Sequence, residues 1–350
     1  MFNYLLSYIK YPQNPPQYEQ KIFSYQNAFS DFVIVDEEDF IQLPKILSKS
    51  DWEQIIKDDS LKNFKEDDIY YSLLKGIPFV IRKDVWLVLC EINKLKQKHA
   101  QFNYKKECEK ESIYDKQILK DVPRTYSDFQ YFFNEKNEGQ TRLYRILKAY
   151  AFFDPEVGYV QGMNFIVASL LIHMNPENEK EIKDVYIINS SYEENIFWML
   201  VSIMQNKNLR ILFVKNMEGI YGYIENLENI LKCKVKEVYE HIKEIGLDVF
   251  TCFNQYYFTI LMYNAPKTFQ KRVLDLFLFK GKIILEQIIV KMLKICEEQI
   301  LQIQEMEELN NFFKKGIMEY CEKEFKKQKK LNINQIQDLL LYNSQTYQYF

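Results

Sequence analysis

The sequence predicts an all-α fold. Apolar residues recur with helical spacing over almost the whole chain from Trp52 to Tyr342, and turn-separated runs of alternating apolar and polar residues are absent. Two segments, MNFIVASLLIHM and NIFWMLVSIMQ, are apolar on nearly all sides, which is typical of central helices. We therefore expect no sheet of more than two short strands. No internal repeat of fixed period is found, although an α-solenoid is left open.

The composition is that of a globular protein that can bury a sizeable core, with 47% hydrophobic and 27% charged residues. The net charge of −3 gives no electrostatic basis for binding nucleic acid or acidic lipid. The six cysteines lack metal-type close spacing and only three histidines occur, so we expect no zinc site and reduced cytosolic thiols. The N-terminus lacks the basic and apolar regions of a signal peptide.

The first segments differ from the rest of the chain. Residues 1 to about 50 are irregular: YPQNPPQYEQ is typical of an extended linker, and DFVIVDEEDF is compatible with a short strand or a docking segment. The first helix is predicted at DWEQIIKD, with Asp51 as its N-cap. A helix over KDVWLVLCEINKLKQ follows, because its apolar residues have helical spacing.

Two stretches without charge, residues 157–176 and 249–266, raise the question of membrane spans. Both carry amide side chains, including Gln161 and Asn254, and we interpret both as buried helices of a globular core. The polar segment NPENEKEIKDVYIINSSYEEN between the two central helices is predicted to be an exposed loop.

The C-terminal part is predicted to consist of further helices. VKEVYEHIKEIG is amphipathic, with Gly246 as its C-cap, and RVLDLFLFKG ends in the same way at Gly281. The segment KIILEQIIVKMLKICEEQILQ is predicted as one long amphipathic helix, and NINQIQDLLLY as the last helix.

One arginine occupies a distinctive position in the segment DVPRTYSDFQYFF. Val122 precedes Pro123, which disfavours the α conformation at Val122. Ser127 and Gln130 have the spacing of a capping box that would start the next helix. We therefore expect Arg124 on a short, fixed connection between two helices, with its side chain pointing outward.

Three short patterns occur in order along the chain: GIPFVIRKDVW, with Arg82 and Trp86; ILKDVPR, with Ile118, Asp121 and Arg124; and GYVQGMN, with Tyr159, Gln161 and Gly162. Each pattern alone is weak, because an arginine after proline is usually a solvated turn residue and a buried glutamine is usually a satisfied core group. Together they resemble the TBC family of Rab GTPase-activating proteins, whose fingerprints are R-x-x-x-W, I-x-x-D-x-x-R and Y-x-Q in this order.

The resemblance continues through EENIFWMLVSIM, the helix pair from YGYIENL to GLDVF, and RVLDLFLFKG. It implies a TBC multi-helix domain over residues 70–345 with a motif core at 76–285, preceded by an N-terminal arm or linker with the first helix at 1–68. The chain departs from the family pattern at three positions that we interpret as packing positions, namely Leu274, Tyr256 and Ser127.

The resemblance implies that the protein stimulates GTP hydrolysis by a Rab-family small GTPase in its GTP form and thereby regulates vesicle and membrane traffic. Arg124 and Gln161 would be the catalytic fingers supplied in trans. The protein would complete its partner's active site and would not be an enzyme by itself. It would need no cofactor of its own, because GTP and Mg²⁺ belong to the partner. A cytoplasmic location follows, with peripheral association at endomembranes left open.

The remaining motif residues have supporting roles under this resemblance. Asp121 would pair with Arg124 or a neighbouring backbone donor, and Tyr159 would position the Gln161 turn, where Gly162 allows a tight backbone path. Arg82 and Trp86, four residues apart on one helix face, would hold the fold and the floor of the active site. Two alternatives stay open: a catalytically weak TBC-fold scaffold within a larger assembly, and a helical adaptor whose motif matches are accidental.

Overall fold

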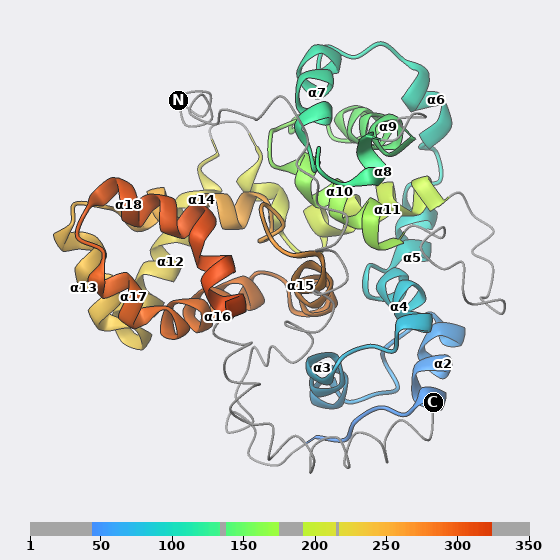
Figure 1. The fold of residues 1–350 in the computed structure, drawn as a ribbon. Coiled ribbons are helices and arrows are strands. Elements are labelled where there is room, and N and C mark those ends of the chain that lie inside the picture. The colour runs from blue at the N-terminus through green and yellow to red at the C-terminus, as the bar shows by residue number, and fades with distance from the viewer. Residues whose placement is uncertain (1–43, 134–137, 175–191, 215–216, 324–350) are drawn as a thin grey trace.

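The computed structural model describes residues 44–133, 138–174, 192–214 and 217–323. Every regular element in these ranges is a helix, and they contain no β-strand (Figure 1). The predicted all-α fold is confirmed.

Several predictions lie outside the described residues. These are the linker and the possible strand of the first 43 residues, nearly all of the polar loop after Met174, and the last helix at NINQIQDLLLY.

The helices fall into three successive groups along the chain. The first group is α2 (Lys49–Asp58), α3 (Glu66–Lys75), η3 (Phe79–Ile81), α4 (Arg82–Leu89), α5 (Ile92–Lys98), α6 (Tyr104–Glu109), α7 (Asp115–Asp121), η4 (Val122–Arg124) and α8 (Gln130–Phe133). The second group is α9 (Glu138–Phe153), α10 (Met163–Met174), α11 (Tyr192–Gln205) and η6 (Leu209–Leu212). The third group is α12 (Gly219–Lys234), α13 (Lys236–Glu244), α14 (Val249–Phe258), α15 (Lys267–Lys280), α16 (Lys282–Ile295), α17 (Glu297–Gln302), α18 (Met306–Asn311) and η7 (Phe312–Gly316).

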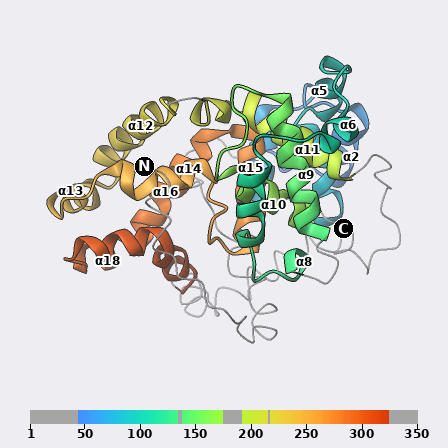
Figure 2. The same cartoon turned by 90° about the horizontal axis from the view of Figure 1, so that it is seen from above.

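Helix α10 lies at the centre of the fold. It packs against α9, α11 and α15, and only Phe165 and His173 in it are more than slightly exposed. Figure 2 shows α9, α10 and α15 side by side. The almost continuous apolar sequence of α10 is therefore satisfied by neighbouring helices. No helix in the described ranges has both the length and the apolar character needed to cross a membrane.

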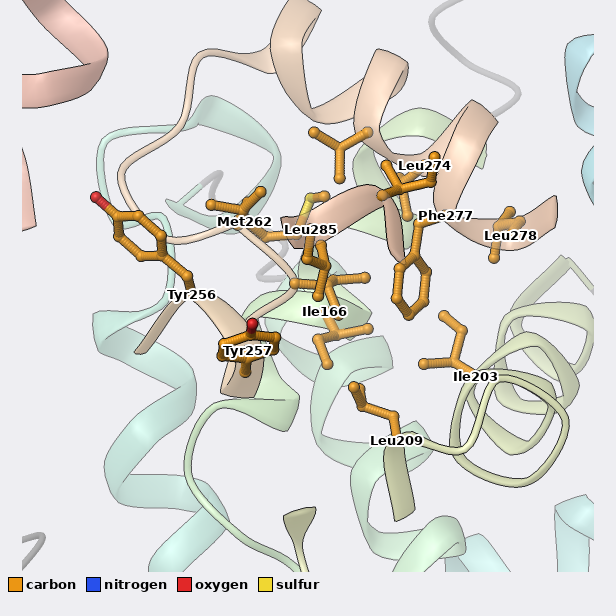
Figure 3. Close-up of a cluster of buried hydrophobic side chains, with 14 of the residues drawn as sticks. Ile166, Ile203, Leu209, Tyr256, Tyr257, Met262, Leu274, Phe277, Leu278 and Leu285 are labelled. Carbon is orange, nitrogen blue, oxygen red and sulfur yellow. The ribbon is translucent and has the colours of Figure 1, made fainter. Parts of the chain in front are cut away.

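Apolar side chains from α10, α15 and α16 meet in one core cluster (Figure 3). Ile166, Leu274 and Leu285 are each fully buried there. Burial of apolar surface stabilises the folded state by about 25 cal/mol per Å². The shared cluster therefore holds α15 and α16 of the third group against α10. The same α10 helix begins at Met163, directly after the candidate site residues Gln161 and Gly162.

Three local predictions concern helix ends. Helix α2 begins at Lys49, and its N-cap is Ser48 rather than Asp51. Asp51 is the third helical residue, and its carboxylate accepts from the Ser48 N–H at 2.8 Å while the Ser48 hydroxyl accepts from the Asp51 N–H. This is a reciprocal capping box displaced by three positions. Gly281 is confirmed as the C-cap of α15, whereas the C-cap of α13 is Ile245 and Gly246 directly follows it; both glycines have positive φ.

Two segments that were predicted as single helices are each broken in two. The first breaks at Glu91, whose φ of 52° is left-handed, between α4 and α5. The second breaks at Cys296, between α16 and α17. Cys90 and Cys296 are both fully buried, so the chain changes direction inside the core while the apolar residues on both sides stay covered.

The second uncharged stretch, residues 249–266, is only partly helical. Helix α14 ends at Phe258, and Ile260, Leu261 and Asn264 have positive φ values of 44°, 61° and 55°. Ile260 and Leu261 are nevertheless buried, which accounts for the helix-like apolar content of a segment that turns back on itself.

Candidate functional site

The Arg124 segment is more helical than the sequence predicts. Helix α7 continues directly into η4, and Val122 keeps helical angles of −55° and −49° although Pro123 follows it. Pro123 lies in the first turn of η4, where a backbone N–H would have no partner within the helix, so the missing N–H of proline costs no hydrogen bond. The predicted capping box at Ser127 is wrong, because Ser127 lies in a turn and α8 begins at Gln130.

The Arg124 side chain points outward, with 40% of its surface exposed, but it is not free. Its Nη2 donates to Asp121 Oδ1 at 2.6 Å, and its Nε donates to the carbonyl oxygen of Lys120 at 3.0 Å. These bonds use two of the five N–H donors of a guanidinium group. The side chain is therefore held against the end of α7 while part of its planar fork faces solvent.

Asp121 connects this arginine to the second motif. Its side chain is 6% exposed, and its Oδ2 accepts a hydrogen bond from the Tyr159 hydroxyl at 2.9 Å. Burial, and then the adjacent Asp121 carboxylate, raise the pKa of Tyr159 above its usual range. Tyr159 is thus a protonated donor. One oxygen of Asp121 bonds the arginine turn, which is the segment 122–129 between α7 and α8, and the other bonds the glutamine turn, which is the segment 154–162 between α9 and α10.

The glutamine turn begins at Asp154, directly after α9. The carbonyl oxygen of Asp154 accepts from the N–H of Gly158 at 2.8 Å, and its carboxylate accepts two bonds from Arg210 of η6, at 2.6 and 2.8 Å. Gly158 has a φ of 63°, and a Cβ there would lie 2.1 Å from the Tyr114 ring. No residue other than glycine fits this position without displacing Tyr114.

Gly162 ends the turn and precedes α10. Its φ is 113°, and a Cβ would lie 2.9 Å from the carbonyl oxygen of Phe258. The close approach of α14 therefore agrees with the tight backbone path expected at this glycine. Gln161 is partly exposed, and its side chain has no hydrogen-bond partner among the described residues.

The two turns are also joined through side chains that the sequence interpretation did not select. Asn164 Nδ2 donates to Thr125 Oγ1 at 2.8 Å, and Asn164 Oδ1 accepts from the Gly162 N–H at 2.9 Å. Thr125 Oγ1 in turn donates to the carbonyl oxygen of Asp121 at 2.8 Å. One signal was available in the sequence: Thr125 directly follows Arg124, and Asn164 is the last residue of the GYVQGMN pattern, in an otherwise apolar helix.

Arg82 and Trp86 belong to a different cluster, centred on the fully buried Asp275 of α15. Asp275 Oδ1 accepts from Arg82 Nε at 3.1 Å and from Trp86 Nε1 at 2.9 Å, and Oδ2 accepts from Arg272 at 2.7 Å. Arg272 also donates to the carbonyl oxygens of Leu73 and Leu74. Arg82 and Trp86 thus tie α4 to α15, and in the described part of the chain neither of them bonds to Arg124 or Gln161.

The described residues contain no group of three or more His, Cys, Asp or Glu side chains that could hold a metal ion. The groups of this site that a partner could contact are therefore the partly exposed guanidinium of Arg124 and the partly exposed amide of Gln161. Buried polar groups hold the turns that carry them.

The Rab-GTPase-TBC domain model matches residues 80–301, which is more than half of the chain and includes every motif residue named above. The chain belongs to this family. Its TBC domain is similar to Rab GTPase-activating protein tbc-11 of Caenorhabditis elegans, with 29% identity over 259 residues that cover 72% of this chain and 25% of tbc-11. It is also 30% identical to GTPase-activating protein GYP5 of Eremothecium gossypii over 250 residues, covering 71% of this chain and 27% of GYP5. This chain spans about a quarter of the length of these curated relatives.

Solved TBC domains share the fold. The Chlamydomonas flagellar RabGAP TBC domain aligns with a TM-score of 0.62 and 24% identity, covering 78% of this chain and 88% of that one. The Ypt/Rab-GAP domain of Gyp1p aligns with a TM-score of 0.57 and 19% identity, covering 89% and 99%. These likenesses support the arrangement of helices in this TBC domain.

Two of the three departures from the family pattern, Leu274 and Tyr256, lie at packing positions of the TBC domain, and the interpretation of Ser127 as a packing position is wrong. Leu274 is fully buried in the core cluster, and the buried Tyr256 donates its hydroxyl hydrogen to the Phe313 carbonyl oxygen. Ser127 is exposed in the turn before α8. Within the described residues, none of the three bonds to Arg124, Asp121 or Gln161.

Proposed function

We propose that this TBC domain stimulates GTP hydrolysis by a Rab-family GTPase in its GTP form, with Arg124 and Gln161 supplied in trans. The observation that carries the proposal is that the arginine turn and the glutamine turn share buried hydrogen bonds through Asp121 and Asn164. This joint construction would present both fingers to one nucleotide. GTP and Mg²⁺ would come with the GTPase, and the TBC domain would bring no cofactor.

The arginine would act on the charge of the transferred phosphoryl group. In phosphoryl transfer, negative charge is spread over phosphate oxygens while the attacking water stays in line. An arginine supplied in trans raises the rate about 10³- to 10⁵-fold in the Ras system, which corresponds to roughly 4 to 7 kcal/mol of transition-state stabilisation. Arg124 suits this role because its guanidinium stays charged when it is desolvated and its planar fork matches phosphate oxygens.

The glutamine would act on the water. A primary amide can accept a hydrogen bond from the attacking water and donate another to a phosphate oxygen at the same time. Gln161 is partly exposed and, among the described residues, its amide is not committed to another group. The Arg210 clamp on Asp154 and the contact of Gly158 with Tyr114 would fix the backbone from which this amide reaches out.

The test is single-turnover GTP hydrolysis by a panel of Rab GTPases with and without the protein. Arg124→Ala and Gln161→Ala are each expected to remove most of the stimulation. Arg145→Ala is a matched control, because Arg145 is also 40% exposed and also pairs with a carboxylate, that of Glu193. If wild-type protein binds a GTP-loaded Rab and does not accelerate hydrolysis, the scaffold alternative replaces the activator. The proposed consequence of activity is regulation of vesicle traffic in the cytoplasm, at the membrane that carries the Rab.

A further inference from the structure

We propose that Asn164 and Thr125 are positioning residues that hold the arginine turn and the glutamine turn in register. This inference rests on the proposed function, because it assigns to the two residues the relative placement of the two fingers. Neither residue would touch the nucleotide. Asn164 is 2% exposed and Thr125 is 1% exposed.

The hydrogen bonds leave one consistent assignment for the donors and acceptors. The Thr125 hydroxyl has one hydrogen, which it donates to the Asp121 carbonyl oxygen, so it must accept from Asn164. The nitrogen of the Asn164 amide therefore faces Thr125, and its oxygen faces the Gly162 N–H, which can only donate. If the amide oxygen and nitrogen were exchanged, the nitrogen would face the Gly162 N–H, so that two donors met, and the oxygen would face a Thr125 hydroxyl that has no second hydrogen to donate. Asn164 thus recognises both turns with the two halves of one amide.

The connection acts on backbone atoms. At one end it holds Gly162, which directly follows Gln161, and at the other it reaches the Asp121 carbonyl and the residue that directly follows Arg124. The Asp121–Tyr159 bond is a second connection, but it runs through the carboxylate that also holds the Arg124 side chain. Among the hydrogen bonds of the described residues, the Asn164 connection joins the two turns without passing through a finger side chain or its counter-ion.

The buried Asn164–Thr125 hydrogen bond could also serve stability alone, without any effect on the placement of the two fingers. The two roles differ in their consequences. Loss of a structural bond lowers the free energy of unfolding, whereas loss of register lowers the rate at a bound phosphate, since a displacement of about 1 Å can reduce a rate about 100-fold. The test must therefore separate stability from turnover.

Thr125→Val removes the hydroxyl and keeps the shape, and Thr125→Ser keeps the hydroxyl. Ser72→Ala is the matched control, because Ser72 is also buried, donates to the carbonyl four residues earlier (Asp68) and accepts from a distant N–H (Leu47). We expect Thr125→Val to lower kcat for stimulated hydrolysis about 10- to 100-fold with KM for the GTPase within about twofold. Ser72→Ala should lower Tm to a similar extent and leave kcat unchanged, and Thr125→Ser should restore kcat.

A second measurement does not depend on activity. Hydrogen–deuterium exchange is followed in the peptides that cover residues 121–129 and 158–163. Thr125→Val should speed exchange in the 158–163 peptide, and Asn164→Ala should speed exchange in the 121–129 peptide, while Ser72→Ala changes neither.

Exchange that stays confined to the mutated turn overturns the inference, as does a Thr125→Val protein that stimulates hydrolysis as well as Ser72→Ala does. If wild-type protein stimulates no Rab, the proposed function fails, and the cross-turn exchange alone then decides whether the two turns are held in register.

Discussion

Arg124 donates to Asp121 across 2.6 Å, so the exposed guanidinium is anchored by a carboxylate that is itself buried. The anchor lies three residues before the arginine and is fixed on its other side by Tyr159. Arg124 therefore keeps a defined position on the surface before any partner binds. Such a preorganised cation is what electrostatic stabilisation of a transition state requires.

Arg124→Lys is expected to abolish most stimulated hydrolysis and leave folding nearly unchanged. Lysine keeps a positive charge beside Asp121 but lacks the planar fork with which an arginine can bond two phosphate oxygens. An exposed residue carries little packing energy, so Tm should stay close to that of wild type. Complex formation with the GTP-bound partner should persist. The measurement is the stimulated rate of both proteins with the same GTPase; full activity in the lysine variant would reduce Arg124 to an ordinary turn residue.

Gly162→Ala is expected to lower both stability and stimulated turnover. The added Cβ would lie 2.9 Å from the Phe258 carbonyl oxygen, and a φ of 113° is strained for alanine. A conformation of this kind costs about 1–3 kcal/mol. Gly222→Ala is the control, since nothing lies within 4 Å of a Cβ there and Gly222 is inside helix α12. Urea unfolding of the two variants checks this; equal stability would mean that α14 moves away without cost.

Asp275→Asn is expected to be strongly destabilising. Asp275 is the shared acceptor for Arg82, Trp86 and Arg272, and removal of its charge leaves two arginines in a buried cluster without their counter-ion. Breaking a buried ion pair in this way costs about 3–5 kcal/mol. Glu66→Gln is the control, because the Glu66 side chain is 70% exposed in its pair with Lys280 and contributes little. Thermal unfolding gives the comparison, and a Tm loss no larger than that of the control would contradict the prediction.

Stability is expected to fall in mild acid partly because of His173. Desolvation of the half-buried imidazole, followed by the nearby charges of Lys267, Lys271 and Arg82, lowers the pKa of His173 well below 6.5. Its Nε2 lies 3.3 Å from Gln270 Oε1, and its ring packs edge-on against Trp86.

Below pH 6.5 the unfolded chain binds a proton at this position that the native state does not bind, so the free energy of unfolding decreases as the pH falls toward the native pKa. The contribution is at most about 1.4 kcal/mol for each pH unit. His173→Gln should therefore show a shallower loss of stability between pH 7.5 and 5 in urea titrations. Parallel curves for wild type and variant would show that His173 takes up its proton in the native state.

Part of the fold follows from neighbouring residues alone and was predictable. The apolar runs of α10 and α11, the glycine stop at Gly281, and the helical class of the whole described chain depend on local conformational preference and periodicity. The motif order was sufficient to indicate the TBC family. The domain boundaries and the roles of the site residues stay predictions.

Other features depend on contacts between distant segments. The breaks at Glu91 and Cys296 and the non-helical path after Phe258 interrupt sequences with continuous helical periodicity, because packing against the core outweighs a local preference worth less than about 1 kcal/mol per residue. Val122 is helical before a proline for the same reason: α7 and η4 pack together on α9.

The candidate site divides in the same way. The sequence by itself made Arg124 and Gln161 the candidate fingers, because both lie in motifs whose order resembles that of the TBC family. Only the tertiary structure decided that Asp121 bonds Tyr159, that Asn164 bonds Thr125 and that Arg210 holds Asp154. A hydrogen bond requires two groups within about 3 Å in a defined orientation, and that distance between residues about 40 or more positions apart is set by the packing of whole helices.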